Sequence, residues 1–222
     1  MKPLIVANWK MNPQTLVEAK RLFDSVKKGI RKVGGVEVII CPPFVYLPIL
    51  KANGAQDCFW EEKGAFTGEV SPPTLKNLSC QYVIIGHSER RRYFEETDEM
   101  INKKIKAALK VGLKPILCIE KISQIKKGIK GITKKDFKKI ILAYEPAWAI
   151  GTGKACGIPE VRKKNLSIRK ILKRNILLYG GSVNSQNARD FIKKAKFQGL
   201  LIGGASLDPK EFIAIVKNVS NA

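Results

Sequence analysis

Eight short apolar runs recur along this chain of 222 residues and constrain its fold more than any other feature. They span residues 4–7, 36–40, 55–59, 82–85, 115–119, 140–144, 176–179 and 199–202. Most of them are continuously apolar rather than alternating, which indicates strands that are covered on both faces. Strands of this kind belong to a parallel sheet. The runs therefore predict an α/β protein.

Helix-like segments lie between most of the predicted strands. The clearest of them are residues 13–32, 97–111, 159–173 and 209–218. Asp208 followed by Pro209 is typical of a helix start. Eight β-then-α units without a Pro/Gly/Ser-rich linker predict a (β/α)8 barrel that occupies residues 1–222 as a single domain. A doubly wound open sheet has the same periodicity and remains the structural alternative.

The composition excludes several classes of protein. No apolar stretch reaches the ~18 residues that span a bilayer, and the first residues do not resemble a signal peptide. The five cysteines form no CxxC pair and are odd in number, which favours buried, reduced thiols. We therefore expect a cytoplasmic protein without a membrane segment.

The formal net charge of +22 is extreme. A lysine-rich solvated surface is the simplest explanation, while attraction of an anionic substrate or loose nucleic-acid binding are the alternatives. No motif that reads RNA or DNA accompanies the charge, and no aromatic residues interleave with it. We therefore do not expect nucleic acid as a partner.

The single histidine, His87, follows the predicted strand 82–85 after only one residue, Gly86. An isolated histidine is more often an ordinary surface or core residue than a catalytic one. However, α/β proteins place reacting groups at the carboxyl end of a buried parallel strand. The position of His87 therefore makes it the first catalytic candidate.

Other reactive side chains follow predicted strands in the same way. Asn8 and Lys10 follow the first strand, Glu89 follows the fourth together with His87, and Glu145 follows the sixth. In a barrel these strand ends share one face, so the side chains are expected to converge. A carboxylate facing an imidazole can move protons, and a nearby lysine can stabilise developing negative charge.

Glycines follow the last two strands. Ser182 comes after a pair of glycines behind the seventh strand, and Gly203 and Gly204 come directly after the eighth. Each glycine pair alone is more often an ordinary tight turn. After the seventh and eighth strands of a barrel, however, they occupy the usual place for binding a phosphate through backbone N–H groups.

The segment after the sixth strand, which starts at Pro146, predicts a lid over this face. Trp148 and Ile150 are apolar groups that can exclude water, and Gly151 and Gly153 permit the backbone to rearrange. A static loop with a packed tryptophan is the alternative.

These residues lie in motifs that resemble those of the triosephosphate isomerase family. The matching segments are Ala7-Asn8-Trp9-Lys10-Met11-Asn12, Gly86-His87-Ser88-Glu89-Arg90-Arg91, Ala143-Tyr144-Glu145-Pro146, the stretch 148–153, Tyr179-Gly180-Gly181-Ser182-Val183 and Ile202-Gly203-Gly204-Ala205-Ser206-Leu207. They follow one another in the family's order over nearly the whole chain. Together they are far more specific than any one motif.

The resemblance implies an isomerase that interconverts dihydroxyacetone phosphate and D-glyceraldehyde 3-phosphate without a cofactor or a metal. It implies that Glu145 is the base that moves a carbon-bound proton, and that neutral His87 polarises the carbonyl. Lys10 would stabilise the enediolate, Asn8 would help to fix the substrate, and Glu89 would support the site from behind.

The resemblance also implies how the substrate phosphate and a second subunit are bound. The phosphate would lie on backbone N–H groups of Gly151, Ser182, Gly203 and Gly204, with Gly151 making its contact when the lid closes. The family is usually dimeric, and Thr67 would lie at the tip of a loop that approaches the partner's site. A homodimer is therefore expected, although an ordinary exposed loop is the simpler alternative.

The chain departs from the family pattern in several places. The fifth and sixth β/α units look shortened, and Asp57 stands where an asparagine is common beside the subunit contact. Two alternatives therefore remain, namely an inactive basic barrel that binds phosphate ligands or nucleic acid, and a different phosphosugar enzyme. The joint presence of Lys10, His87 and Glu145 argues against the inactive barrel, because binding alone needs no base. A different phosphosugar enzyme would not be expected to carry this pair of His87 and Glu145.

Overall fold

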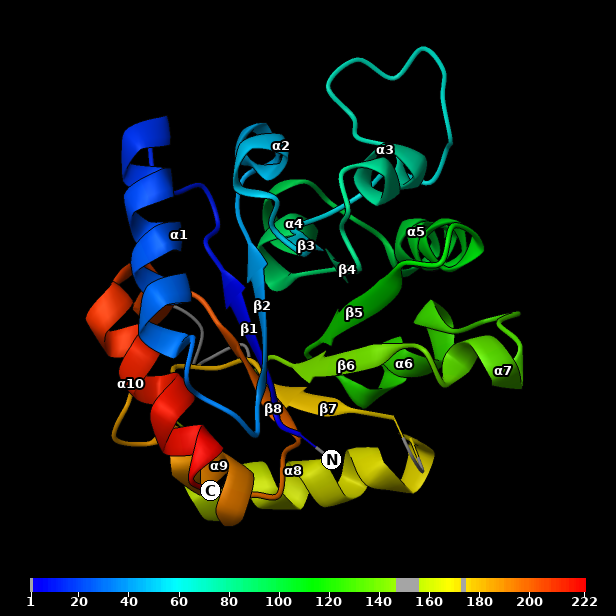
Figure 1. The fold of residues 1–222 in the computed structure, drawn as a ribbon. Coiled ribbons are helices and arrows are strands. Elements are labelled where there is room, and N and C mark those ends of the chain that lie inside the picture. The colour runs from blue at the N-terminus through cyan, green and yellow to red at the C-terminus, as the bar shows by residue number, and fades with distance from the viewer. Residues whose placement is uncertain (1, 147–155, 173–174) are drawn as a thin grey trace.

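The computed structural model describes residues 2–146, 156–172 and 175–222. Eight parallel strands form one sheet in the order β2-β1-β8-β7-β6-β5-β4-β3, and this sheet curls into a nearly closed barrel surrounded by helices (Figure 1). The strands are β1 (Leu4–Asn8), β2 (Glu37–Cys41), β3 (Gly54–Ala55), β4 (Tyr82–Ile85), β5 (Lys114–Ile119), β6 (Ile141–Tyr144), β7 (Leu177–Tyr179) and β8 (Gly199–Ile202). The predicted (β/α)8 barrel is confirmed.

Side-chain bonds hold the barrel together where β2 and β3 meet. Asn53 accepts the N–H of Ile40 through Oδ1 at 3.1 Å and donates from Nδ2 to the carbonyl of Val38 at 3.2 Å. Gly54 is needed at this point, because a Cβ there would lie 2.5 Å from Sγ of Cys41. The side chain of Asn53, just before β3, thus makes the hydrogen bonds to β2 that a neighbouring strand would otherwise make through its backbone.

The third strand is shorter than the sequence predicted. Residues 55–59 were expected to form it, but β3 contains only Gly54 and Ala55. The Asp57 carboxylate instead bonds with Lys104 and Arg90, so the chain leaves the sheet soon after the strand begins.

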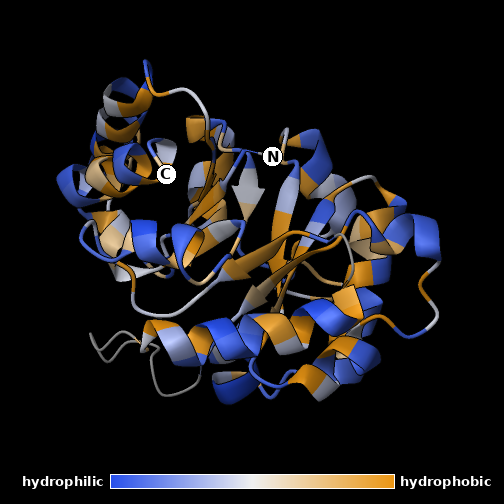
Figure 2. Cartoon of the chain, turned by 90° about the horizontal axis from the view of Figure 1, so that it is seen from below, coloured by the Kyte–Doolittle hydropathy of each residue, from blue (hydrophilic) through white to orange (hydrophobic). Residues whose placement is uncertain are grey.

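The helices surround the strands and carry apolar residues on one side, as Figure 2 shows. The longer helices are α1 (Leu16–Ile30), α5 (Asp98–Lys110), α8 (Ile158–Leu172) and α10 (Pro209–Ser220). The shorter helices are α2 (Leu47–Leu50), α3 (Pro72–Asn77), α4 (Ser88–Tyr93), α6 (Ile122–Gly128), α7 (Lys134–Phe137) and α9 (Ala188–Lys193). Two 3₁₀ turns are η1 (Phe44–Tyr46) and η3 (Gly204–Leu207). Thr15, Thr97 and Asp208 cap three of the longer helices, because each side chain accepts a backbone N–H of the first turn.

Apolar side chains fill the inside of the barrel. The residues that point inward and are buried there are Leu4, Val6, Ile39, Cys41, Tyr82, Ile84, Ile116, Cys118, Ile141, Ala143, Leu178 and Leu201. A barrel packed in this way is a core rather than a pore, so binding sites are confined to its two mouths.

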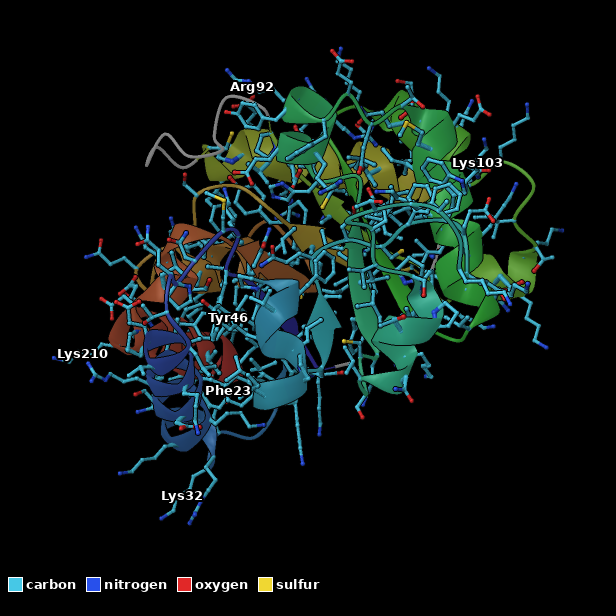
Figure 3. All side chains as sticks on the ribbon, turned by 90° about the horizontal axis from the view of Figure 1, so that it is seen from above. Phe23, Lys32, Tyr46, Arg92, Lys103 and Lys210 are labelled. Atoms are coloured by element: carbon cyan, nitrogen blue, oxygen red, sulfur yellow. The ribbon has the colours of Figure 1, made fainter. Side chains whose placement is uncertain are left out.

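Charged side chains are spread over the outside of the molecule. In Figure 3, Lys32, Lys103, Lys210 and Arg92 extend outward at well-separated places on the periphery. This distribution fits the lysine-rich solvated surface that the composition suggested. Within the described residues, no helix is long and apolar enough to cross a membrane.

Candidate functional site

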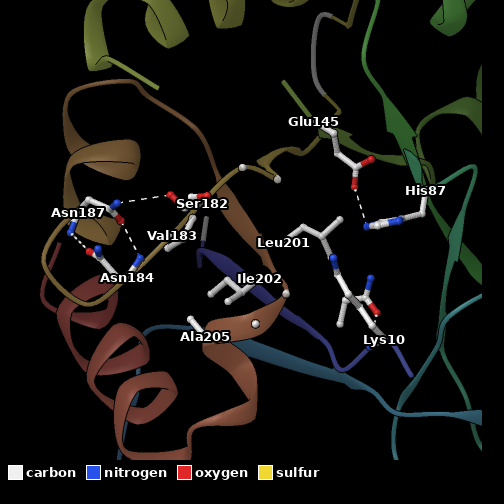
Figure 4. A pocket seen from close by; sticks show the side chains of 15 residues that line it. Lys10, His87, Glu145, Ser182, Val183, Asn184, Asn187, Leu201, Ile202 and Ala205 are labelled. Carbon is white, nitrogen blue, oxygen red and sulfur yellow. Dashed lines mark hydrogen bonds and ion pairs between the residues drawn. The ribbon is translucent and has the colours of Figure 1, made fainter. Parts of the chain in front are cut away.

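A cavity of about 410 Å³ opens at the carboxyl ends of the strands (Figure 4). It is lined by Asn8, Lys10, His87, Glu145, Gly180, Gly181, Ser182, Val183, Asn184, Asn187, Leu201, Ile202, Gly203, Gly204 and Ala205. In Figure 4, the side chains of Lys10, His87 and Glu145 lie on one side of the cavity, and Ser182, Asn184 and Asn187 lie on the other. The structure therefore brings together residues that the sequence placed after the first, fourth, sixth, seventh and eighth strands.

The hydrogen bonds of His87 define its protonation. The residue precedes α4, and its Nδ1 accepts the backbone N–H of Glu89 at 3.3 Å. A nitrogen that accepts a hydrogen bond carries no proton, so the neutral ring holds its proton on Nε2. His87 therefore presents one N–H donor to the cavity.

Glu145 is nearly completely buried, with 1% of its surface exposed. Its Oε1 lies 3.2 Å from Nε2 of His87, and its Oε2 accepts the backbone N–H of Ser88 at 3.0 Å. Gly180 makes room for this side chain, because a Cβ at Gly180 would lie 3.0 Å from Cγ of Glu145. The carboxylate thus faces the imidazole in an environment with little water.

Lys10 reaches the same place from the end of β1 in an uncommon backbone conformation. Its φ of 54° lies in the left-handed region, which costs a residue with a Cβ roughly 1–2 kcal/mol. Its N–H donates to Oδ1 of Asn8 at 3.0 Å, and its ammonium group lies 2.5 Å from Oε1 of Glu89. Glu89 Oε2 in turn lies 3.7 Å from Nδ1 of His87. Glu89 therefore lies between Lys10 and His87 and holds the ammonium group of Lys10 in position.

Several residues that the sequence interpretation missed also shape this site. Gln56 donates to the carbonyl oxygens of Lys10 at 2.8 Å and Cys41 at 2.9 Å, so it fixes the backbone of Lys10 against β2. Asn187 and Leu201 line the cavity directly. Gln56 lies inside the predicted strand 55–59, so no strand-end signal marked it; in the structure it follows directly after the end of β3 at Ala55.

The two glycine segments lie where the sequence predicted, beside the cavity. A Cβ on Gly203 would lie 3.1 Å from Cε of Lys10, so the absence of a side chain at Gly203 makes room for the Lys10 side chain. Asn187 braces the other segment by donating to the carbonyl of Ser182 at 3.4 Å and by accepting the N–H of Asn184 at 2.9 Å. Both segments offer backbone groups to an anion in the cavity.

The predicted lid cannot be placed in the same way. Pro146 is buried directly after Glu145. The other predicted lid residues, which are Trp148, Ile150, Gly151 and Gly153, lie outside the described residues. Thr67 is exposed on the loop between β3 and α3, away from the residues that line the cavity of the same chain.

The thiol of Cys118 lies within the barrel close to the site. Burial, and then the charge of Glu145, raise the pKa of this thiol well above its usual value. Cys118 therefore remains a neutral packing group beside the carboxylate.

Within the described part of the chain, no group of three or more His, Cys, Asp and Glu side chains could hold a metal ion.

A buried network of four charges lies near the strand ends β3 and β4. Lys104 Nζ lies 2.6 Å from Oδ2 of Asp57, which is also 2.8 Å from Nε of Arg90, and both cations bond with Glu96 as well. Burial raises the pKa of Asp57 to about 6 against the attraction of Lys104. Burial also opposes ionisation of Glu96, but the hydrogen bonds from Lys104 and Arg90 outweigh it and lower the pKa. Of the two carboxylates in the network, Asp57 is therefore the one whose charged form is disfavoured on balance.

Replacing Asp57 by Asn is expected to stabilise the protein at high pH. The folded-state pKa of about 6 lies above the ordinary aspartate value of 3.8, so the folded protein binds the extra proton between these pH values. The contribution of Asp57 to the free energy of unfolding consequently falls as the pH rises through that window. We expect Asp57→Asn to gain about 1–3 kcal/mol at pH 8 and to lose this gain near pH 4.

Urea unfolding at a fixed protein concentration would measure this effect. Asp24→Asn, which changes an exposed carboxylate on α1, is the matched control and should show no such pH dependence. A variant at position 57 that is less stable than the wild type at pH 8 would show that the ionised Asp57 is favourable.

Comparison with known proteins agrees with this arrangement. The family model described as triosephosphate isomerase matches residues 3–219. A triosephosphate isomerase of Dictyoglomus thermophilum is 43% identical over 251 aligned positions, which cover 98% of this chain and 99% of the relative. The relatives of that name from Dehalococcoides mccartyi and Lactobacillus delbrueckii subsp. bulgaricus are also 43% identical and cover 99% and 96% of this chain.

The aligned length of 251 positions exceeds the 222 residues of this chain, so the Dictyoglomus relative has residues without a counterpart here. The similarity nevertheless extends over nearly the whole of both proteins. Nothing among these relatives supports the alternative of an inactive barrel. By its fold, its cavity and its relatives, the chain belongs to the triosephosphate isomerase family.

Proposed function

We propose that this isomerase interconverts dihydroxyacetone phosphate and D-glyceraldehyde 3-phosphate at the cavity that contains Lys10, His87 and Glu145. The observation that carries the proposal is the hydrogen-bonding of His87. Its Nδ1 accepts a backbone N–H, which leaves the ring proton on Nε2, and Nε2 lies 3.2 Å from Oε1 of Glu145. A neutral donor opposite a buried base suits proton transfer next to a carbonyl group.

The proposed reaction moves two protons and no other atoms. Glu145 removes a proton from the hydroxymethyl carbon of dihydroxyacetone phosphate, and the electron pair of the broken C–H bond forms the double bond of an enediolate. His87 donates its Nε2 proton to the former carbonyl oxygen and recovers a proton from the neighbouring hydroxyl group. Glu145 then returns its proton to the adjacent carbon, which leaves the aldehyde.

Substrate binding must change one contact of the free site. His87 has a single N–H, and in the structure Glu145 lies within reach of it. When the substrate carbonyl accepts that N–H, Glu145 is released to face the carbon. The ammonium group of Lys10, held by Glu89 at 2.5 Å, stabilises the negative charge that then develops.

The substrate phosphate is proposed to bind at the opposite side of the cavity. Ser182 lines that side, Gly203 and Gly204 line the cavity between it and Lys10, and Asn8 helps to fix the substrate through its place beside Lys10. Closure of the segment from Pro146 to Gly153, with Trp148 and Ile150, would add a contact from Gly151 and would exclude water from the intermediate.

The test of this function is a direct assay with purified protein. Dihydroxyacetone phosphate is added, and the appearance of D-glyceraldehyde 3-phosphate is followed through a coupled dehydrogenase, without any added metal or cofactor. Turnover that saturates with substrate is the expected result. Absence of turnover with a folded protein would overturn the proposal.

We further propose that the protein is a homodimer in the cytoplasm. Support comes from large apolar side chains that are exposed in the segments after the first four strands, namely Met11 after β1, Val45 in η1, Ile49 in α2, Phe66 between β3 and α3, and Phe94 after α4. Thr67 lies in the same loop as Phe66. Exposed apolar groups gathered at one end of a molecule are typical of an interface. Buried Cys41, Cys58, Cys80 and Cys118 fit a reducing compartment.

Met11→Asp is expected to convert the dimer into a monomer. Met11 is 90% exposed in the single chain, so a charge there costs the monomer little but is unfavourable in an interface. Sedimentation equilibrium at micromolar concentration should show a dimer for the wild type and a monomer for the variant. Leu166→Asp, at a residue on α8 that is 58% exposed, is the control and should remain dimeric. A monomeric wild type would contradict the proposed assembly.

A further inference from the structure

A second cavity lies at the opposite mouth of the barrel from the catalytic candidates. Its volume is about 430 Å³, and it is formed by the amino ends of the strands and the residues that precede them. Four lysines line it, and they are Lys2 before β1, Lys114 at the start of β5, and Lys138 and Lys139 before β6. This mouth of a (β/α)8 barrel normally serves stability rather than binding. The concentration of ammonium groups here therefore requires an explanation.

Negative charge in the cavity does not balance these lysines. Glu37 is the single carboxylate among the lining residues, and it accepts a hydrogen bond from the hydroxyl group of Tyr82. Asp136 lies 2.8 Å from Lys139 and compensates one more ammonium group. Among the described residues, neither Lys2 nor Lys138 has an ion-pair partner. At least two positive charges at this mouth are thus left for a ligand.

One of the lysines is held in place in advance. The ammonium group of Lys114 lies 4.9 Å above the ring centre of Tyr82 and donates to its hydroxyl oxygen at 3.3 Å. Tyr82 is itself buried inside the barrel. A cation fixed on a rigid strand loses little conformational freedom when an anion binds, which favours binding. Leu4, Ile141 and Ile176 form an apolar wall around it.

We propose that this mouth binds a small anion with several phosphate groups, of the linear polyphosphate class. Lysine ammonium groups bind phosphate as point charges, and several of them around one concavity match several phosphates in a chain. The concave shape favours a compact ion over a nucleic-acid strand, because strands bind along grooves that track their backbone and carry stacking aromatic residues. The site is separate from the proposed reaction and does not depend on it.

The experiment is a calorimetric titration with inorganic tripolyphosphate in the presence of excess triose phosphate, which occupies the catalytic cavity. The variant is the double change Lys2→Gln and Lys138→Gln, because these residues make no ion pair that folding needs. The control is Lys126→Gln with Lys130→Gln, two exposed lysines in and after α6 that lower the net charge equally. Isomerase activity of both doubles should equal that of the wild type.

The proposal expects one bound tripolyphosphate and a loss of affinity of about tenfold or more in the first double, since two charge-assisted contacts are removed. The control double should change affinity less than about twofold. Equal weakening in the two doubles would overturn it in favour of long-range attraction alone. Tripolyphosphate binding that is found only when triose phosphate is omitted would assign the binding to the catalytic cavity and would also overturn it.

Two further probes separate the possible occupants. A parallel titration with ATP distinguishes free polyphosphate from a nucleotide that carries the same phosphate chain, and binding of either supports the proposal. Binding of a short single-stranded RNA, with the same loss in the first double and without tripolyphosphate binding, would overturn the proposal and identify nucleic acid instead.

Discussion

Glu145→Gln is expected to lower kcat by about 10³-fold. The amide has nearly the same size as the carboxylate and can still occupy the space beside Gly180, but it cannot accept the carbon-bound proton. A positioned general base contributes roughly 10²–10⁴-fold to a rate, so this loss should appear in kcat. KM should change little, because the proposed phosphate contacts lie on the other side of the cavity.

The coupled assay with wild type and variant side by side measures this effect. Glu99→Gln is the matched control, because the Glu99 side chain is 80% exposed on α5 and, among the residues that the structure describes, forms an ion pair with Lys103 alone. Its activity should equal that of the wild type. Equal activity of Glu145→Gln and the wild type would show that the base has been assigned to the wrong residue.

Glu145→Asp adds a geometric test to the same assay. The shorter side chain keeps the charge but withdraws the carboxylate by more than an ångström from the substrate. A displacement of this size is expected to cost on the order of 10²-fold in kcat. An aspartate that retained full activity would indicate that the carboxylate acts through its charge rather than by direct proton transfer.

Lys10→Met is expected to reduce kcat/KM by about 10³-fold. Methionine preserves most of the length of the side chain but removes the ammonium group that lies 2.5 Å from Glu89. Lys10 carries the only positive charge among the described residues that line the cavity, so the variant loses it next to the developing enediolate, and Glu89 is left as an uncompensated carboxylate close to the substrate. Losing one such electrostatic contact costs about 10²–10³-fold, and the unpaired charge adds to it.

Lys51→Met provides an unusually close control for this change. Lys51 also has a left-handed backbone, with φ of 51°, but it lies exposed after α2. The two variants therefore share the residue type, the substitution and the backbone conformation. Full activity for Lys51→Met with a large loss for Lys10→Met would assign the effect to the ammonium group in the cavity. A small loss in both would contradict the role proposed for Lys10.

Much of the site could be predicted because strand ends are local in the sequence. His87 and Glu145 each stand within two residues of an apolar run, and the barrel's symmetry brings all such positions to one mouth. Lys10 was predicted for the same reason, because it stands three residues after the end of the first apolar run at residue 7. The repetition of the runs and the helix starts between them predicted eight parallel β/α units, although the periodicity alone left a doubly wound open sheet as an alternative to the barrel.

Features that depend on contacts between distant segments could not be predicted. The end of β3 after Ala55 is determined by Asp57, whose partners Arg90 and Lys104 lie in α4 and α5. The role of Gln56 depends on two carbonyl groups, one on β2 and one after β1. No local pattern marks such contacts, because neither the spacing nor the polarity of these residues differs from that of an ordinary loop.

The central claim is that one carboxylate carries a proton between two neighbouring carbons of a triose phosphate. Isomerisation of dihydroxyacetone phosphate in D₂O, followed by NMR of the D-glyceraldehyde 3-phosphate formed, tests it most directly. A protonated Glu145 can exchange with solvent before it returns its proton, so the product should carry deuterium at the carbon next to the aldehyde. Product formed at the enzyme-catalysed rate without any deuterium at that carbon would contradict the claim, because it would indicate a direct hydride shift.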